Sequence, residues 1–369
     1  MTASSETISK PEIEKTERAQ ITARYNKAIK KKTIFIFFLF ILVIIAAGIA
    51  ATIGAYQITF TEVYSILFHC LFHNVETYEQ YAIWDLRLPR ILLAILAGVG
   101  LAVAGTMMQG ILKNPLAEPY TMGIASGAAF GAALAIILGT SIFGTGAVVD
   151  DRYLLIGNAF VFALIPAFVV LAFVLYRKPT PGVLVLAGIS MLYIFSALTM
   201  LIEVPANPDA VKVAQFWAIG SLERASWQDI FPISLVLACC IPLLMWKTWD
   251  VNILNSGDET AESIGVNVKR TKIFIMMVSA VLTAGVVCFV GAIGFVGLVA
   301  PHVCRMIIGA DNRFLLPASA MFGAVLLLLA DTIARTIMAP LVIPIGIVTA
   351  IIGTPLFLFL VLKKKEEYW

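Results

Sequence analysis

Charged side chains are scarce in this chain of 369 residues, of which 13% are charged and 60% are hydrophobic. Soluble domains carry about 25% charged and about 45–50% apolar residues, so the composition excludes an ordinary soluble fold. The apolar residues recur in long uncharged runs, and roughly 20 such residues form a helix that crosses a bilayer. Because lipid admits only internally bonded helices or closed barrels, these runs predict an all-α polytopic membrane protein.

The residue patterns of several other activities are also missing. The chain has no GxxxxGK[ST] loop to cradle nucleotide phosphates, so we expect any ATP hydrolysis to occur in a separate subunit. Its five cysteines show no metal-ligand spacing, and we expect no catalytic residue, no cofactor and no bound metal. A formal net charge of +3 is too small to indicate a nucleic-acid partner.

The hydrophobic runs predict ten spans after a polar N-terminal arm of residues 1–32. The run from Ile273 to Cys304 is too long for one ordinary span, and its glycines and Pro301 predict a break within it. The transmembrane domain then covers residues 33–365, with a polar loop at about 247–272. The predicted spans are 33–55, 89–111, 120–140, 153–176, 182–202, 230–246, two within 273–309, 314–336 and 342–362.

Positive charge predicts the orientation of these spans. Lys30, Lys31 and Lys32 precede the first span, and Lys363, Lys364 and Lys365 follow the last. Because Lys and Arg collect on the cytoplasmic side, both termini are expected in the cytoplasm of a multi-pass cell-membrane protein. An even number of spans follows, and it places most of the 26 Lys and Arg residues inside.

Small residues recur every fourth position in the second and third predicted spans. Such stripes let helices approach closely where lipid gives no hydrophobic drive, so we expect tight helix packing. The stripes are Ala94, Gly98, Ala102, Thr106 and Gly110, and Gly123, Gly127, Gly131, Ala135 and Gly139.

The polar loop contains a short helical pattern from Gly257 to Gly265. Asp258 is predicted as its N-cap, Glu259 lies in an acidic first turn, and Gly265 is expected at the C-terminal end. A helix this short is unstable alone. Ala261 and Ile264, three residues apart, would form a small apolar face for a groove on a cytosolic partner, although a plain surface helix fits the pattern equally well.

Three arginines and one histidine are candidate functional residues. Arg87 and Arg90 lie at the outer start of the second span, where the helix dipole disfavours cations. They either receive an acidic partner or extend toward lipid headgroups. Arg335 follows Asp331 by four residues, so the two could neutralise each other. His302 could relay protons, but a lone histidine more often holds irregular backbone.

Taken together, these segments resemble the FecCD-type permeases of binding-protein-dependent ABC importers, a family that includes the cobalamin permease. The resemblance covers nearly everything from Asp85 to the C-terminus. Its motifs are Arg87-Leu-Pro-Arg90, Asn114-Pro-Leu-Ala-Glu-Pro119, Gly257-Asp-Glu-Thr-Ala261, Gly291-Ala-Ile-Gly-Phe-Val-Gly-Leu298, Pro301-His302, Leu329-Ala-Asp-Thr332 and Pro344-Ile-Gly-Ile-Val-Thr349.

The resemblance implies a type II importer permease fold with ten spans. It also implies two permease subunits in the lipid, identical or paralogous, with two ATPase subunits below and an extracytoplasmic binding protein above. An iron-siderophore, haem or cobalamin-like substrate would pass between the permease subunits.

Roles for individual residues follow by the same analogy. Arg87, Arg90 and Arg335 would meet acidic residues of the binding protein, and Asn114 and Leu116 would form part of a cytoplasmic gate. The segment that would couple to the ATPase comprises Gly257, Asp258, Glu259, Thr260, Ala261, Ile264 and Gly265.

Two other classes of protein remain as alternatives. An ion-coupled secondary transporter would be expected to carry partnered acids or histidines at mid-membrane, and acids are few in these apolar runs. A membrane scaffold or receptor that transports nothing is the second alternative.

Overall fold

A computed structural model describes residues 10–54, 58–141, 144–145, 152–176 and 181–362. The described chain is almost entirely helical, and its only strands are β1 (Thr140–Ser141) and β2 (Gly144–Thr145), which pair antiparallel. The expected basic cluster at residues 363–365 lies outside the described residues. The longer helices are α1 (Lys10–Thr52), α4 (Leu88–Leu112), α5 (Ile124–Leu138), α6 (Arg152–Tyr176), α7 (Pro181–Glu203), α9 (Trp227–Trp246), α12 (Val268–Val290), α13 (Val296–Ile308), α14 (Asn312–Thr336) and α15 (Ile345–Leu362).

These ten helices match the ten predicted spans. In the described part of the chain, seven helices are long and apolar enough to cross a membrane, and α5, α13 and α15 are shorter apolar helices. The predicted break is confirmed, because α12 ends at Val290 and α13 begins at Val296. The part assigned to Pro301 is wrong, since Pro301 and Gly297 lie inside α13 and the break comprises residues 291–295. The first helix differs from expectation, since α1 continues without interruption through residue 32 into the polar arm.

Shorter helices connect the spans, and the hydrophobic pattern did not predict most of them. They are α2 (Phe60–Cys70), α3 (Tyr78–Tyr81), the π-helix η1 (Ala82–Arg87), the 3-10 helix η2 (Pro119–Met122), α8 (Pro208–Ile219), α10 (Thr248–Asn255) and α11 (Asp258–Ser263). Of these, only α11 was expected. Their polar or mixed sequences give no long apolar run, which is why the search for spans passes over them.

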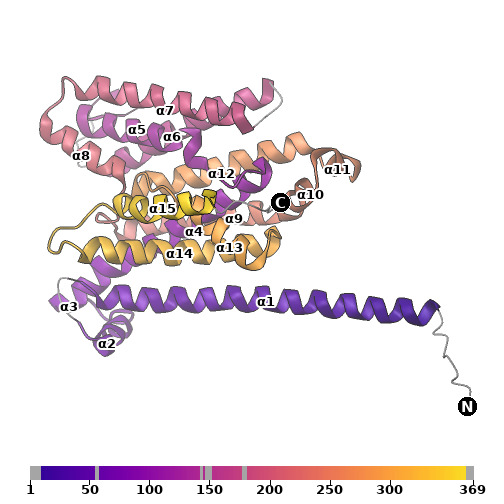
Figure 1. The fold of residues 1–369 in the computed structure, drawn as a ribbon. Helices are drawn as coiled ribbons and strands as arrows, with labels where there is room; N and C mark the ends of the chain where they lie inside the picture. The colour runs from indigo at the N-terminus through magenta and orange to yellow at the C-terminus, as the bar shows by residue number, and fades with distance from the viewer. Residues whose placement is uncertain (1–9, 55–57, 142–143, 146–151, 177–180, 363–369) are drawn as a thin grey trace, which may run out of the picture.

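The helices pack side by side in the order α1, α14, α4, α12, α6 and α5. Figure 1 shows α1 along one edge of the bundle and α5, α6 and α7 along the opposite edge. The two ends of the bundle also differ. Helices α2, α3 and α8 lie at one end, and α10 and α11 lie at the other, here called the α11 end. The first end is here called the arginine end, because Arg87 closes the π-helix η1 that directly follows α3.

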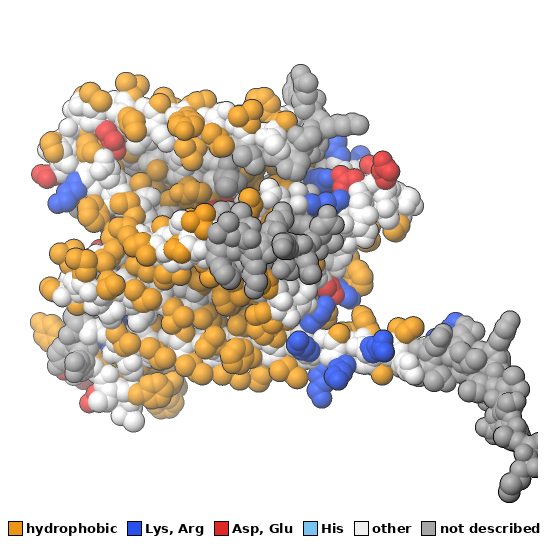
Figure 2. All heavy atoms as spheres, viewed as in Figure 1, with side chains coloured by type: hydrophobic (Ala, Val, Ile, Leu, Met, Phe, Trp, Pro, Cys, Tyr) orange, Lys and Arg blue, Asp and Glu red, His pale blue; other side chains and the backbone are white. Residues whose placement is uncertain are grey.

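The core depends on the small-residue stripes, as the sequence predicts. A Cβ atom on Gly98 would lie 2.4 Å from the carbonyl oxygen of Gly323, and one on Gly131 would lie 2.5 Å from that of Asn158. Backbones in such contact leave no room for a side chain, so α4 packs directly on α14 and α5 on α6. Large apolar side chains on the outer surfaces cover the flanks of the bundle in Figure 2.

Candidate functional sites

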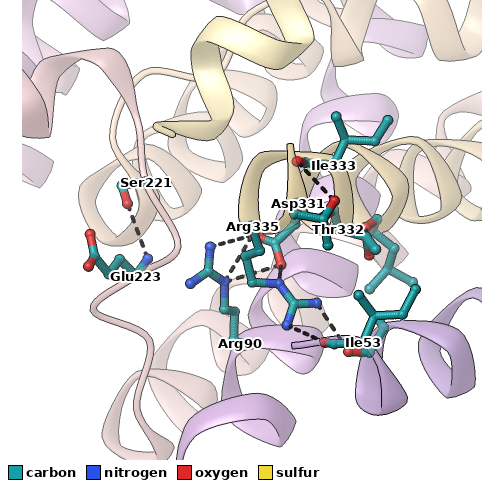
Figure 3. Close-up of polar contacts among 11 residues, drawn as sticks. Ile53, Arg90, Ser221, Glu223, Asp331, Thr332, Ile333 and Arg335 are labelled. Atoms are coloured by element: carbon teal, nitrogen blue, oxygen red, sulfur yellow. Dashed lines mark hydrogen bonds and ion pairs between the residues drawn. The ribbon is translucent and has the colours of Figure 1, made fainter. Parts of the chain in front are cut away.

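An ion-pair cluster between α4 and α14 lies at the arginine end. Nε of Arg90 donates to Oδ1 of Asp331 at 2.9 Å, and Nη2 donates to the same oxygen at 2.8 Å. Nε of Arg335, one turn further along α14, lies 3.1 Å from Oδ2 of Asp331. One carboxylate therefore binds two guanidinium groups (Figure 3), and the predicted pairing of Asp331 with Arg335 is confirmed.

Arg87 and Arg335 also bind the C-terminal end of α1. Nη1 of Arg87 donates to the carbonyl oxygens of Ala51 at 2.6 Å and Thr52 at 3.1 Å. Nη2 of Arg335 donates to the carbonyl oxygen of Ala50 at 3.1 Å. The last carbonyls of a helix lack partners within it and carry partial negative charge. The two arginines therefore cap α1.

This capping explains a placement that looked unfavourable in the sequence. Arg87 precedes the N-terminus of α4, but its side chain turns to the opposite dipole end of α1. It is 7% exposed, so it does not extend toward lipid headgroups as one interpretation expected. Docking of a binding protein on Arg87, Arg90 and Arg335 stays a prediction, and these side chains already have partners inside the molecule.

The segment predicted to couple to an ATPase, Gly257 to Gly265, lies at the opposite end of the bundle and forms α11. Gly257 precedes α11 with φ +121°, and Gly265 follows it with φ +95°, a region that L side chains rarely adopt. The N–H of Gly265 donates to the carbonyl of Glu262 at 3.0 Å, and that of Val266 donates to Ala261 at 2.9 Å. These two bonds form a Schellman motif, which explains the sharp end of the helix.

Two details predicted for this segment are wrong. Gly257 is the N-cap of α11, and Asp258 is its first helical residue, because the Asp258 side chain turns toward lysines on other elements. Ala261 is fully buried in the core while Ile264 is 64% exposed, so they do not share an apolar face. The outward surface of α11 instead combines Ile264 with the exposed acids Glu259 and Glu262.

Asp258 ties α11 to two other elements. Its Oδ1 accepts from Nζ of Lys113, just after α4, at 3.1 Å, and its Oδ2 accepts from Nζ of Lys272 in α12 at 2.6 Å. Partial burial alone would raise the pKa of Asp258, but the hydrogen bonds and charges of Lys272 and Lys113 lower it below its usual value. The carboxylate therefore stays ionised and holds the three elements together.

Lys113 begins the loop that contains the predicted gate residues. Its backbone is left-handed, with φ 47°, and ends α4. Asn114 then folds the loop, since its Oδ1 accepts from the N–H of Leu116 at 3.0 Å. The Leu116 side chain is 44% exposed. The proposed gate residues thus lie one and three positions from the lysine that binds α11.

The first turn of α13, directly after the break, lies against the C-terminal half of α4. A Cβ atom on Gly105 would lie 2.0 Å from the carbonyl oxygen of Gly297, so the two backbones touch. Nε2 of Gln109 donates to the carbonyl oxygens of Gly297 at 3.2 Å and Leu298 at 3.3 Å. His302 is partly buried in the second turn of α13. Side-chain bonds from Gln109 therefore hold the first turn of α13, directly after the break, against α4.

Sequence reasoning missed Lys113, Lys272 and Gln109. No local pattern identifies the two lysines, because they lie 145 and 14 residues from their shared partner. Gln109 carried a signal, since a lone amide inside an apolar span marks a buried hydrogen bond. Among the described residues, no three His, Cys, Asp or Glu side chains cluster as metal ligands would.

Comparisons with known proteins agree over nearly the whole chain. The model of the FecCD transport family matches residues 39–363. A putative ABC transporter permease of Methanocaldococcus jannaschii is 44% identical, covering 93% of this chain and 98% of the relative. The hemin transport system permease protein HmuU of Yersinia pestis is 37% identical, covering 93% and 99%. A solved structure described as an inward-facing conformation of a putative metal-chelate type ABC transporter is 32% identical, with a TM-score of 0.77 over 89% of this chain and 98% of that one.

Proposed function

This chain belongs to the FecCD transport family, and we propose that it is the subunit through which an iron-siderophore, haem or cobalamin-like chelate crosses the cell membrane. It is a permease of the metal-chelate type of ABC importer. The names of relatives cover hemin, Fe(3+)-citrate, cobalamin and molybdate, and organic iron or cobalt chelates predominate among these. We assign the α11 end to the cytosol and the arginine end to the outside.

The observation that carries the proposal is the fixed position of α11. The helix is bounded by two left-handed glycines, is anchored by buried Ala261, and presents Ile264, Glu259 and Glu262 outward. A short, held helix at one end of a membrane bundle suits a groove on a separate protein. We assign that protein as the ATPase subunit, of which the complete importer has two.

Asp258 connects α11 to the loop that contains the proposed gate residues. A displacement of α11 would move Lys113 through its 3.1 Å ion pair with Asp258. Lys113 directly precedes the loop of Asn114 and Leu116, so this loop would move as well. Closure of the ATPase pair would favour one position of α11 over another, and the loop would follow. The free energy then comes from the different affinities of the ATPase for the two arrangements.

At the outer end, the binding protein delivers the chelate near Arg87, Arg90 and Arg335. Acidic residues of that protein would join or replace Asp331 as partners of Arg90 and Arg335. Such an exchange would loosen the cap on α1 at the moment of docking, since Arg335 binds both Asp331 and α1. Two copies of this chain, or one copy and a paralogue, would enclose the pathway.

The experiment is uptake by proteoliposomes that contain the purified permease, with and without the ATPase subunits, the binding protein and ATP. Labelled ferric siderophore, haem and cobalamin are compared. We expect one of them to be taken up only when ATPase and ATP are both present. Uptake that needs an ion gradient and no ATPase would instead support the alternative, an ion-coupled secondary transporter.

A further inference from the structure

At the arginine end, helix α2 lies alongside the last turns of α1 and does not cover the end face of the bundle. In Figure 1 it sits on the side of α1 that faces away from the other spans, at the level of the last turns of α1. A Cβ atom on Gly48, one turn before the end of α1, would lie 3.4 Å from Cε2 of Phe60 and 3.7 Å from Oη of Tyr64. The first turn of α2 therefore packs on a part of α1 that lies within the predicted first span.

The exposed face of α2 carries a row of aromatic side chains at a spacing of four. Phe60, Tyr64, Phe68 and Phe72 are 55%, 49%, 70% and 72% exposed, the last lying in the turn after the helix. Phe60 meets Tyr64 edge to face, and Phe68 meets Phe72 in the same way. Leu71, 64% exposed, lies beside this row. Large apolar side chains gathered on one exposed face mark a contact with lipid or with another protein.

The rest of the α2 surface divides into two sectors. Val63 and Cys70 are buried against the bundle, with Ile66 and Leu67 partly buried beside them. At about 100° per residue, the polar side chains Ser65, His69 and Glu62 form a sector between the aromatic row and these buried residues, and Thr61 falls within the aromatic row. A helix with one apolar and one polar exposed face, lying beside a span, has the form of an interfacial membrane helix.

The charges of α2 favour lipid over a protein partner. Its only acid, Glu62, is bound by the N–H of Thr59 at 2.9 Å and by its hydroxyl at 2.8 Å, and the helix has no Lys or Arg. It therefore offers a protein partner one charged side chain, the exposed Glu62, which lies outside the aromatic row. The aromatic row also continues an apolar surface of α1, where Phe37, Ile41, Ile44 and Ile45 are exposed along the span.

We propose that α2 is an interfacial helix whose aromatic row, Phe60, Tyr64, Phe68 and Phe72, is embedded in the membrane leaflet at the arginine end. The row rests in the acyl region beside the headgroups, and the polar sector faces water. Because the helix carries no cation, insertion depends on apolar contact and proceeds in zwitterionic phosphatidylcholine without anionic lipid. The helix then holds the turn that leads to Arg87 at a fixed depth, since α2 contacts η1.

The experiment places the photoreactive analogue p-benzoylphenylalanine at Phe68 in the full-length permease in phosphatidylcholine nanodiscs. The analogue keeps an aromatic ring, so the fold is preserved. Two matched positions serve as controls: Phe37, 62% exposed on α1, for hydrocarbon, and Tyr78, 89% exposed on α3, for water. After illumination, mass spectrometry of the peptides identifies what each position has captured.

We expect phospholipid adducts at Phe68 and Phe37 and none at Tyr78. A parallel illumination in the presence of the binding protein should leave the adduct at Phe68 unchanged. Capture of the binding protein or of a second permease copy at Phe68 would overturn the proposal, as would the absence of any lipid adduct there while Phe37 gives one. Equal lipid yields at all three positions would also contradict it, because α2 would then have no defined depth.

Discussion

At the arginine end, Asp331 binds both Arg90 and Arg335, and these three side chains are no more than 11% exposed. At the α11 end, Asp258 binds both Lys113 and Lys272, and its side chain is 47% exposed. Removing one partner from a buried ion pair leaves an uncompensated charge and is strongly destabilising. Exposed pairs contribute little to stability, with a median of about 0–1 kcal/mol. The first cluster therefore contributes more to the stability of the fold than the second, in which Lys272 alone is as buried, with a side chain 11% exposed.

The largest effect is expected from Asp331→Ala at the arginine end. This change leaves Arg90 and Arg335 buried without a counter-ion and should destabilise the permease by about 3–5 kcal/mol. The loss of stability is measured as a lower melting temperature, with size-exclusion chromatography used to quantify the folded permease that remains after heating. The control Glu223→Gln changes an exposed acid nearby in Figure 3 whose carboxylate lies outside the cluster, and it should leave the melting temperature unchanged. Equal melting temperatures for the Asp331 variant and the native chain would show that the cluster is not structural.

The next effect is expected from Asp258→Asn at the α11 end. The fold should survive, but the weakened link to Lys113 should lower ATP-driven uptake by about fivefold or more while the ATPase still binds. Uptake and ATPase binding are measured together. The matched control is Asp250→Asn, which removes an ion pair confined to Lys247 and α10. If both variants transport equally well, Asp258 has no role in coupling.

A smaller effect is expected from Arg90→Gln. Asp331 keeps Arg335 as a partner, so the loss of stability should be less than for Asp331→Ala. If Arg90 also receives the binding protein, docking should weaken by about 1 kcal/mol and its salt dependence should decrease. Titration of the binding protein at two salt concentrations tests this. An unchanged affinity and salt slope would restrict Arg90 to a structural role.

The smallest effect is expected from Gly265→Ala. This change puts a side chain on left-handed backbone at a cost of about 1–2 kcal/mol, and it should distort only the C-terminal end of α11. ATPase affinity should fall by about tenfold or less. The control Gly294→Ala meets nothing within 4 Å and has no positive φ, so it should bind as the native chain does. Identical affinities for both variants would place α11 outside the ATPase contact.

The two ends also differ in how far the sequence predicted them. Hydropathy found the ten long helices and the break near Gly291, because apolar runs and glycine act locally. The capping pattern of the sequence also identified the segment from Gly257 to Gly265. Sequence reasoning missed the capping of α1 by Arg87, which joins residues 36 positions apart, and the burial of Ala261, which depends on neighbours distant in sequence. It missed α2 because that helix has 11 residues, too few for the roughly 20-residue run that marks a span.

The most direct test of the account is the side of the membrane on which α11 lies. A cysteine replaces Glu262 on the exposed face of α11, in a chain where the exposed Cys239 is serine, and a membrane-impermeant maleimide is added to cells. We predict no labelling in intact cells, full labelling after permeabilisation, and protection when the ATPase subunits are bound. Labelling in intact cells would contradict the claim that α11 receives an ATPase in the cytosol.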